Sequence, residues 1–256
     1  MKTQKSLWDN NFFAVLIPFL MFAIARIIMG LPMKVPVVWP DEYIYLFYAQ
    51  FLSGLKDMIF LPASDLVGSF GYPLLIAPLY AFFKEPTNFY NSVIIFNAIL
   101  GSTLYIGVFY LVKDILGANN RQAMLIGILT SLYPAFVLQS NMAYTDSITP
   151  ALFVFTLLTF YYWVKNKTLF STILFTLTCG YLTIVHIRFL PLVFTTIFIV
   201  AYLVYLKKIP AYQFIILLIS FAIITYLNIS IGDSLNLMIT ERVERDDKIM
   251  SSLIQV

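Results

Sequence analysis

Charged residues are scarce in this chain. Asp, Glu, Lys and Arg make up 11% of its 256 residues, whereas hydrophobic residues make up 61%. A soluble globular domain carries about 25% charged residues, and the mean hydropathy of +0.87 points the same way. The composition therefore excludes a soluble domain and predicts a polytopic membrane protein. Basic residues in the loops account for the net charge of +3, so no nucleic-acid partner is required.

Cysteine and histidine are almost absent, since the chain contains only Cys179 and His186. A single cysteine excludes an intrachain disulfide, and we expect Cys179, which lies in an apolar run, to pack in the interior. No CxxC or HExxH spacing occurs, so a structural zinc site is not expected. One histidine cannot build a catalytic metal cluster. The sequence also shows no evident repeat, low-complexity segment or soluble domain.

Long apolar runs are what the chain has instead. A membrane-spanning helix needs about 20 mostly apolar residues, and we predict seven spans at about 12–31, 89–112, 121–138, 147–164, 168–186, 189–206 and 211–229. The segment 70–83, FGYPLLIAPLYAFF, is shorter and broken by two prolines, which favours an interfacial or re-entrant element. The predicted fold is an all-α membrane module over residues 1–232. A polar, helical tail follows at 233–256, as the start of a further C-terminal region.

Basic residues in short loops predict the orientation, because Lys and Arg are enriched on the cytoplasmic side. A cytoplasmic N terminus places one set of residues inside: Lys2, Lys5, Lys113, Arg121, Lys165, Lys167, Lys207 and Lys208. The loop 139–146 on the other side contains no Lys or Arg. We expect the plasma membrane of a bacterium or archaeon, with the endoplasmic reticulum as the alternative, and a long outer loop at about 32–88.

Residues 37–54, VVWPDEYIYLFYAQFLSG, open this outer loop with adjacent carboxylates at Asp41 and Glu42. Proline followed by two acids is typical of a helix N-terminus, and Ser53-Gly54 of a helix stop. The many aromatic residues suit the headgroup region. The pattern predicts a helix on the outer membrane surface with Asp41 at its leading end.

Charged residues near membrane segments are costly and are therefore functional candidates. They are Asp41, Glu42, Lys56, Asp57, Asp65, Lys84, Asp146, His186 and Arg188. Structural alternatives exist for several of them. In these alternatives the acid pair only complements a helix dipole, Asp146 only caps a helix that begins near Ser147, and Arg188 only extends its charge toward the headgroups.

The acids and Arg188 share the outer leaflet in this layout. A carboxylate there can act as a general base, and an arginine near the headgroups can bind phosphate. Transfer of a sugar from a lipid phosphate needs this pairing, because the phosphate leaves readily once its charge is held. A second acid orients the acceptor or holds a divalent cation, and the sequence leaves both open.

Five segments in order resemble the GT-C membrane glycosyltransferases, in the branch of protein O-mannosyltransferases and aminoarabinose transferases. The segments are WPDEYIYLFYAQFLSG (39–54), GYPLLIAPLY (71–80), IIFNAILG with Asn97 (94–101), SLYPAFVLQSNMAYTDS (131–147) and HIRFLP (186–191). The resemblance implies seven spans and interfacial helices in a large first outer loop. It also implies catalytic roles for Asp41, as the base, and Asp146, and contact of Arg188 with the carrier phosphate. Further substrate-binding residues would be Glu42, Tyr45, Lys56, Lys84 and His186.

The predicted function is transfer of a sugar, with inversion, from an undecaprenyl- or dolichyl-phosphate carrier in the cell envelope. The acceptor is an outward-facing glycan, lipid or protein. Relatives of this type continue with further spans or an outer domain, so a minimal enzyme, a fragment and one subunit of a complex all remain open. The competing functions are a flippase or transporter of lipid-linked sugars and a non-catalytic membrane scaffold.

Overall fold

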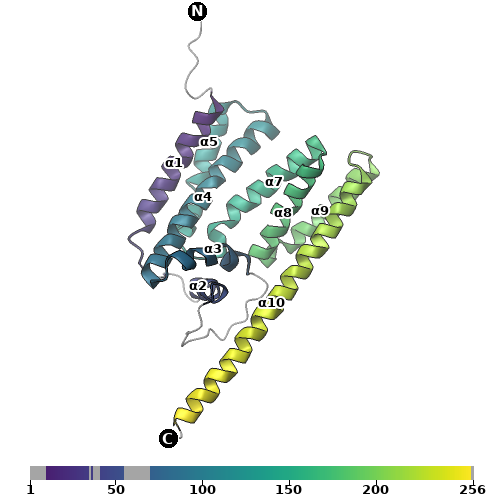
Figure 1. Ribbon diagram of the computed structural model, residues 1–256. Helices are drawn as coiled ribbons and strands as arrows, with labels where there is room; N and C mark the ends of the chain where they lie inside the picture. Colours follow the sequence, from purple (N-terminus) through teal and green to yellow (C-terminus); the bar gives the residue numbers. More distant parts are fainter. Residues whose placement is uncertain (1–9, 35, 37–40, 55–69, 255–256) are drawn as a thin grey trace, which may run out of the picture.

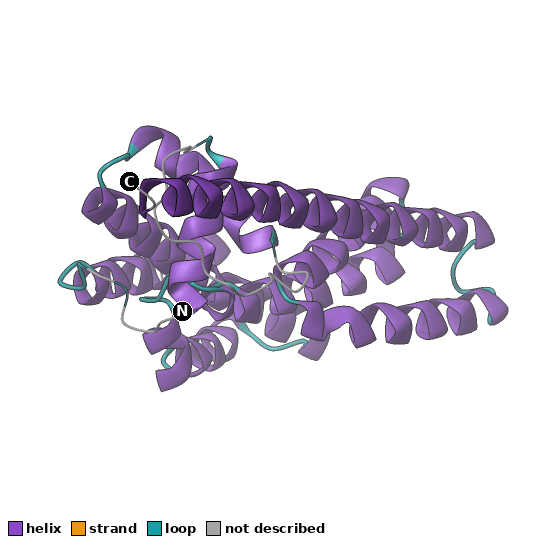
Figure 2. Ribbon diagram, turned by 90° about the horizontal axis from the view of Figure 1, so that it is seen from below, coloured by secondary structure: helices purple, strands orange, loops and turns teal. Residues whose placement is uncertain are grey.

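The computed structural model describes residues 10–34, 36, 41–54 and 70–254, without the side chains of Asp41 and of residues 233–254. Within these residues every regular element is helical (Figure 2). Four stretches are long and apolar enough to cross a membrane: Asn11–Gly30, Pro86–Leu116, Ile187–Tyr205 and Ala211–Gly232. The all-α fold is therefore confirmed, and the seven-span count is not.

The helices follow the predicted segments closely. In chain order they are α1 (Asn11–Gly30), α2 (Asp41–Leu52), α3 (Gly71–Phe82), α4 (Pro86–Leu116), α5 (Asn120–Ser131), α6 (Pro134–Gln139), η2 (Thr145–Ser147), α7 (Thr149–Asn166), α8 (Leu169–Val185), η3 (Ile187–Phe189), α9 (Leu190–Tyr205) and α10 (Ala211–Ile254). The last helix runs without a break through the boundary predicted between module and tail, and the predicted helical state of the tail is confirmed as far as Ile254, beyond which the chain lies outside the described residues.

Helix α4 organises the first half of the bundle, where it packs against α1, α5 and α7. Its buried face includes Leu104, Tyr105 and Phe109, which share an apolar cluster with Ala14 of α1 and Ala123 of α5. The hydroxyl of Tyr105 donates a hydrogen bond to the Ala14 carbonyl. Small residues opposite large ones let these helices approach closely, as is usual between membrane helices.

Helices α7 to α10 form the second half of the bundle, beside the first in Figure 1. Trp163 of α7 stacks on Phe175 of α8, with ring centroids 5.2 Å apart. Cys179 lies fully buried in the same cluster. Its predicted packing role is therefore confirmed.

The predicted continuous span at 121–138 is wrong. Helix α5 ends at Ser131, Tyr133 is extended at φ −56° and ψ 123°, and α6 starts at Pro134. The physical reason is Pro134, which offers no N–H and forces the preceding residue away from the helical conformation. The break leaves α5 only 12 residues long.

Helices α2 and α3 pack together at one end of the bundle, where Figure 1 shows α2 nearly end-on and the long helices from the side. The predicted helix with Asp41 at its leading end is confirmed, since α2 begins at Asp41 and Gly54 beyond its end has φ +85°; its place on the outer membrane surface stays a prediction. Helix α3 has 12 residues, or about 18 Å at 1.5 Å per residue, and is too short to cross a bilayer core of about 30 Å.

Apolar side chains cover much of the outer surface of the bundle. On α10 they recur every four residues at Ile215, Ile219 and Ile223, all exposed, and α1 and α9 carry similar exposed faces. Such surfaces are costly in water and match the hydrocarbon of a bilayer. The long apolar helices are compatible with an integral membrane protein.

Candidate functional site at the α2–α3 end

Glu42 ties the first turn of α2 to the bundle. Its side chain is fully buried and accepts a hydrogen bond of 3.0 Å from the hydroxyl of Tyr90, in the second turn of α4. Complementing the helix dipole does not require burial of the carboxylate. The buried position of Glu42 therefore indicates a packing role beyond the dipole interaction. The contact fixes how α2 is rotated against α4, and thereby the position of the neighbouring Asp41 backbone.

Tyr72 of α3 connects α2, through Tyr45, with the loop before α7, through Asn97. Its ring is fully buried and meets Tyr45 of α2 edge-on, with centroids 5.5 Å apart. Its hydroxyl accepts a hydrogen bond of 2.7 Å from Asn97, which also donates to the Met142 carbonyl. Burial raises the pKa of Tyr72, and the hydrogen bonds with Asn97 and Ser147 act in the opposite direction. The phenol therefore stays neutral.

Gly71 lets α3 meet the end of α8. A Cβ atom there would stand 2.8 Å from the Val185 nitrogen and 2.9 Å from the Ile184 carbonyl carbon. The Gly71 carbonyl accepts a hydrogen bond of 2.9 Å from the Tyr181 hydroxyl. This close approach of backbones brings the GYP segment against the turn that carries His186.

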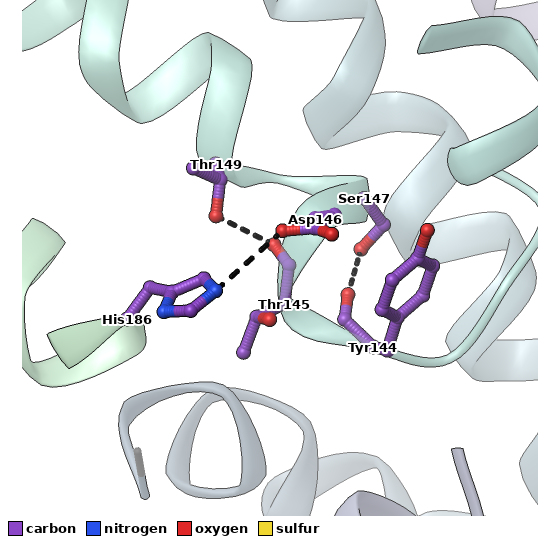
Figure 3. A network of polar contacts seen from close by, with 6 residues as sticks. All are labelled: Tyr144, Thr145, Asp146, Ser147, Thr149 and His186. Carbon is purple, nitrogen blue, oxygen red and sulfur yellow. Dashed lines mark hydrogen bonds and ion pairs between the residues drawn. The ribbon is translucent and has the colours of Figure 1, made fainter. Parts of the chain in front are cut away.

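Asp146 caps no helix, so the helix-cap alternative for this residue is wrong. It lies in η2, and α7 begins only at Thr149, with Ile148 at the cap position and no side-chain cap bond. Its carboxylate instead faces His186, with 3.9 Å between Oδ1 and Nε2 (Figure 3). The neighbouring Ser147 and Thr149 hydroxyls donate to backbone carbonyls. Asp146 is 37% exposed and is therefore open to a ligand.

His186 stands in the turn between α8 and η3. Burial of its ring, and then the positive charge of Arg188, lower its pKa below 6.5, while Asp146 acts in the opposite direction. Its Nδ1 is buried and has no hydrogen-bond partner among the described residues. At neutral pH the imidazole is uncharged, so its contact with Asp146 is not an ion pair between two full charges.

This lowered pKa predicts a loss of stability in acid. Below pH 6.5 the unfolded chain takes up a proton on His186 that the folded chain resists, so folding stability falls as the pH falls. We expect the thermal midpoint in detergent to drop between pH 7.5 and 5.5, and to drop less in His186→Gln. Carboxylates also titrate at lower pH, so the difference between the two proteins is the test. Equal drops would contradict it.

The remaining predicted site residues are dispersed. Arg188 is exposed in η3, and Lys84 is exposed between α3 and α4. Asp41 is the first residue of α2, with its side chain outside the described residues, and Lys56, Asp57 and Asp65 lie outside them altogether. The structure thus brings Glu42, Tyr45, Asp146 and His186 to one end, and Arg188 follows His186 by two residues.

An apolar pocket of about 350 Å³ opens beside this end, between α4, α5, α6, α7 and η3. Its wall includes Leu104, Thr130, Phe136, Pro150, Phe153 and Phe189. The rings of Phe153 and Phe189 lie 5.8 Å apart. Because Phe189 follows Arg188 directly, the apolar pocket and an exposed cation are neighbours.

Sequence reasoning missed Arg26, although it is the only charge inside the first apolar run. The side chain is fully buried, its Nη2 donates to the Ser131 carbonyl at 3.0 Å, and its Nε has no hydrogen-bond partner among the described residues. The carbonyl belongs to the last residue of α5, whose helix bonds stop before Pro134. Arg26 therefore secures the broken helix, and a charge within a span was the signal that marked it.

Among residues whose side chains are described, no group of three or more His, Cys, Asp or Glu gathers as metal ligands do. A divalent cation held by the outer acids stays a prediction.

No protein-family model and no curated protein sequence matches the chain.

Proposed function

We propose that this protein is a membrane glycosyltransferase that moves a sugar from a polyprenyl-phosphate carrier to an acceptor on the outer face of the membrane. The observation that carries the proposal is the position of Asp146. Its carboxylate caps no helix, stays partly exposed and faces His186 at the end of the bundle where α2 begins. A partly exposed acid near the membrane that the bundle does not use as a helix cap is suited to chemistry at this end.

Asp41 acts as the general base in the proposed reaction. It accepts the proton of an acceptor hydroxyl while that oxygen attacks the anomeric carbon. The bond from that carbon to the carrier phosphate breaks, and the phosphate leaves with the bonding electrons, so the configuration inverts. Asp146 orients the acceptor or holds a cation.

The carrier is held by its two unlike parts. Its hydrocarbon chain occupies the apolar pocket beside Phe153 and Phe189, and its phosphate binds Arg188. Arginine suits this task because its guanidinium pairs with two phosphate oxygens at once. The exposed position of Arg188, one residue from the pocket wall, supports this arrangement.

The test is transfer from a labelled carrier. Purified protein in bilayers receives polyprenyl-phosphate sugars and candidate glycan, lipid or protein acceptors, and labelled acceptor is measured. Transfer above that of empty bilayers supports the enzyme. Movement of the carrier between leaflets without transfer would instead establish a transporter, and binding to a partner subunit with neither activity would establish a scaffold.

The proposed topology gives a separate prediction. With the N terminus cytoplasmic, a cysteine placed at position 166 reacts with a membrane-impermeant thiol reagent only after the membrane is opened, whereas one at position 56 reacts in intact cells. The parent carries one buried thiol, Cys179, which serves as the unreactive background. The opposite labelling pattern would overturn the orientation.

A further inference from the structure

A second pocket, of about 410 Å³, lies between the α7–α8 turn and the α9–α10 turn. Figure 1 shows both turns at the end of the bundle away from α2 and α3. Three exposed lysines line this pocket, Lys167, Lys207 and Lys208, together with apolar residues such as Val204 and Ile209. Two turns that are distant in sequence thus bring three positive charges to one cavity.

Two of these lysines hold a backbone conformation that normally favours glycine. Lys167 and Lys207 both have φ +55°, and they are the only non-glycine residues with positive φ in the described chain. Lys167 follows the last turn of α7, where glycine is the usual residue because it lacks a Cβ atom. The chain therefore accepts a less favourable backbone at both positions and retains a lysine side chain there.

Gln213 joins the two turns. Its side-chain amide donates to the Lys167 carbonyl and accepts a hydrogen bond of 3.0 Å from the Trp163 indole. Gln213 is fully buried at the start of α10, and Ile209 in the same turn is buried as well. The lysines are consequently carried by a fixed framework of backbone.

Two other lysines, Lys165 and Lys113, have partners, whereas the described part of the chain supplies none for the side chains of the three pocket lysines. Lys165 lies over the ring of Tyr161, and Lys113 donates hydrogen bonds to Asn11 and Asn120. No carboxylate pairs with any of the three pocket lysines within the described residues, where the one close contact between a basic side chain and a carboxylate joins His186 and Asp146. Three lysines that line one pocket, with no carboxylate paired to them among the described residues, are complementary to an anion.

The surroundings of the pocket indicate that the anion belongs to a lipid. Exposed Tyr202, Tyr205 and Leu206 lie just before the lysines, where the apolar surface of α9 ends. Tyrosine next to lysine at the end of an apolar helix is typical of the headgroup level. We propose that Lys167, Lys207 and Lys208 bind the phosphate of an anionic phospholipid from the leaflet on their side of the membrane. This site is independent of the reaction at the opposite end.

The variant Lys167→Gly/Lys207→Gly tests the proposal, because glycine suits both backbone conformations. Native mass spectrometry of the full chain in neutral detergent measures the occupancy of added phosphatidylglycerol. Each lysine near the membrane surface contributes about five-fold to the affinity for an anionic lipid, so the double substitution is expected to weaken binding by about 25-fold. The thermal midpoint without lipid stays equal or rises, so a binding loss cannot come from unfolding.

The matched control is Lys165→Gln/Arg121→Gln, which removes the same charge from the same end of the molecule but outside the pocket. It keeps phosphatidylglycerol binding within about two-fold of the parent. Equal losses in both variants, or no loss in either, would overturn the site. Equal affinity for phosphatidylcholine would remove the specificity for an anionic headgroup, and inorganic phosphate binding as tightly as the lipid would assign the pocket to a free anion.

Discussion

Asp41→Asn lowers sugar transfer by about 10²–10⁴-fold if Asp41 is the general base, the range typical for loss of such a group. Asparagine keeps the shape and the capping ability of aspartate, so α2 still starts at the same place and the thermal midpoint changes little. The measurement is transfer from a polyprenyl-phosphate sugar by folded variant protein. Activity within a few-fold of the parent would remove Asp41 as the base.

Two other acids serve as controls for this result. Glu85→Gln removes an exposed carboxylate that caps the start of α4, at the same end of the bundle, and is expected to leave transfer intact. Glu42→Gln changes the buried partner of Tyr90, so its main expected effect is on stability and the placement of α2. A larger loss of transfer in Glu42→Gln than in Asp41→Asn would reverse the roles of the two acids.

Gly71→Ala is expected to destabilise the protein by about 1–3 kcal/mol and to reduce transfer with it, the cost typical of overpacking. The added methyl group would meet the backbone at Val185 and Ile184, which cannot move aside as a flexible side chain would. Helix α3 must then shift, and Tyr72 with it. Chemical unfolding in mixed micelles and the transfer assay measure the two effects.

Gly232→Ala is the matched control, because a Cβ atom at that helical position would meet open space. We expect it to be neutral or slightly stabilising, since alanine favours a helix. A Gly71→Ala protein as stable and active as the parent would show that α3 does not depend on this contact.

Local signals in the sequence predicted the elements of this site well. The acids at 41–42 and the stop at Ser53-Gly54 delimited α2, and the short apolar run marked α3 as a short element, although the predicted break at its two prolines is wrong because the helix continues through both. These features depend on backbone chemistry within a few residues, so they are visible in any single sequence. The break of α5 before Pro134 was equally visible and was missed because the apolar run continues across it.

Contacts across the fold could not be predicted in the same way. Glu42 and Tyr90 are 48 residues apart, and Tyr181 and Gly71 are 110 apart. The pairing of these polar groups depends on how α2 and α3 pack against the bundle, and the composition of the chain does not determine that packing. The charge of Arg26 within an apolar run was visible and was overlooked, whereas its partner, a backbone carbonyl, has no signature in sequence.

Helix α10 adds a mechanical property to the molecule. Its 44 residues measure about 66 Å, roughly twice the hydrocarbon thickness of a bilayer. Beyond Gly232 the helix contains neither glycine nor proline, the residues at which helices usually bend. The second half is therefore a lever about 33 Å long. A tilt of about 10° at Gly232 would swing its far end by about 6 Å, so small movements between α8 and α10 become large displacements outside the bundle.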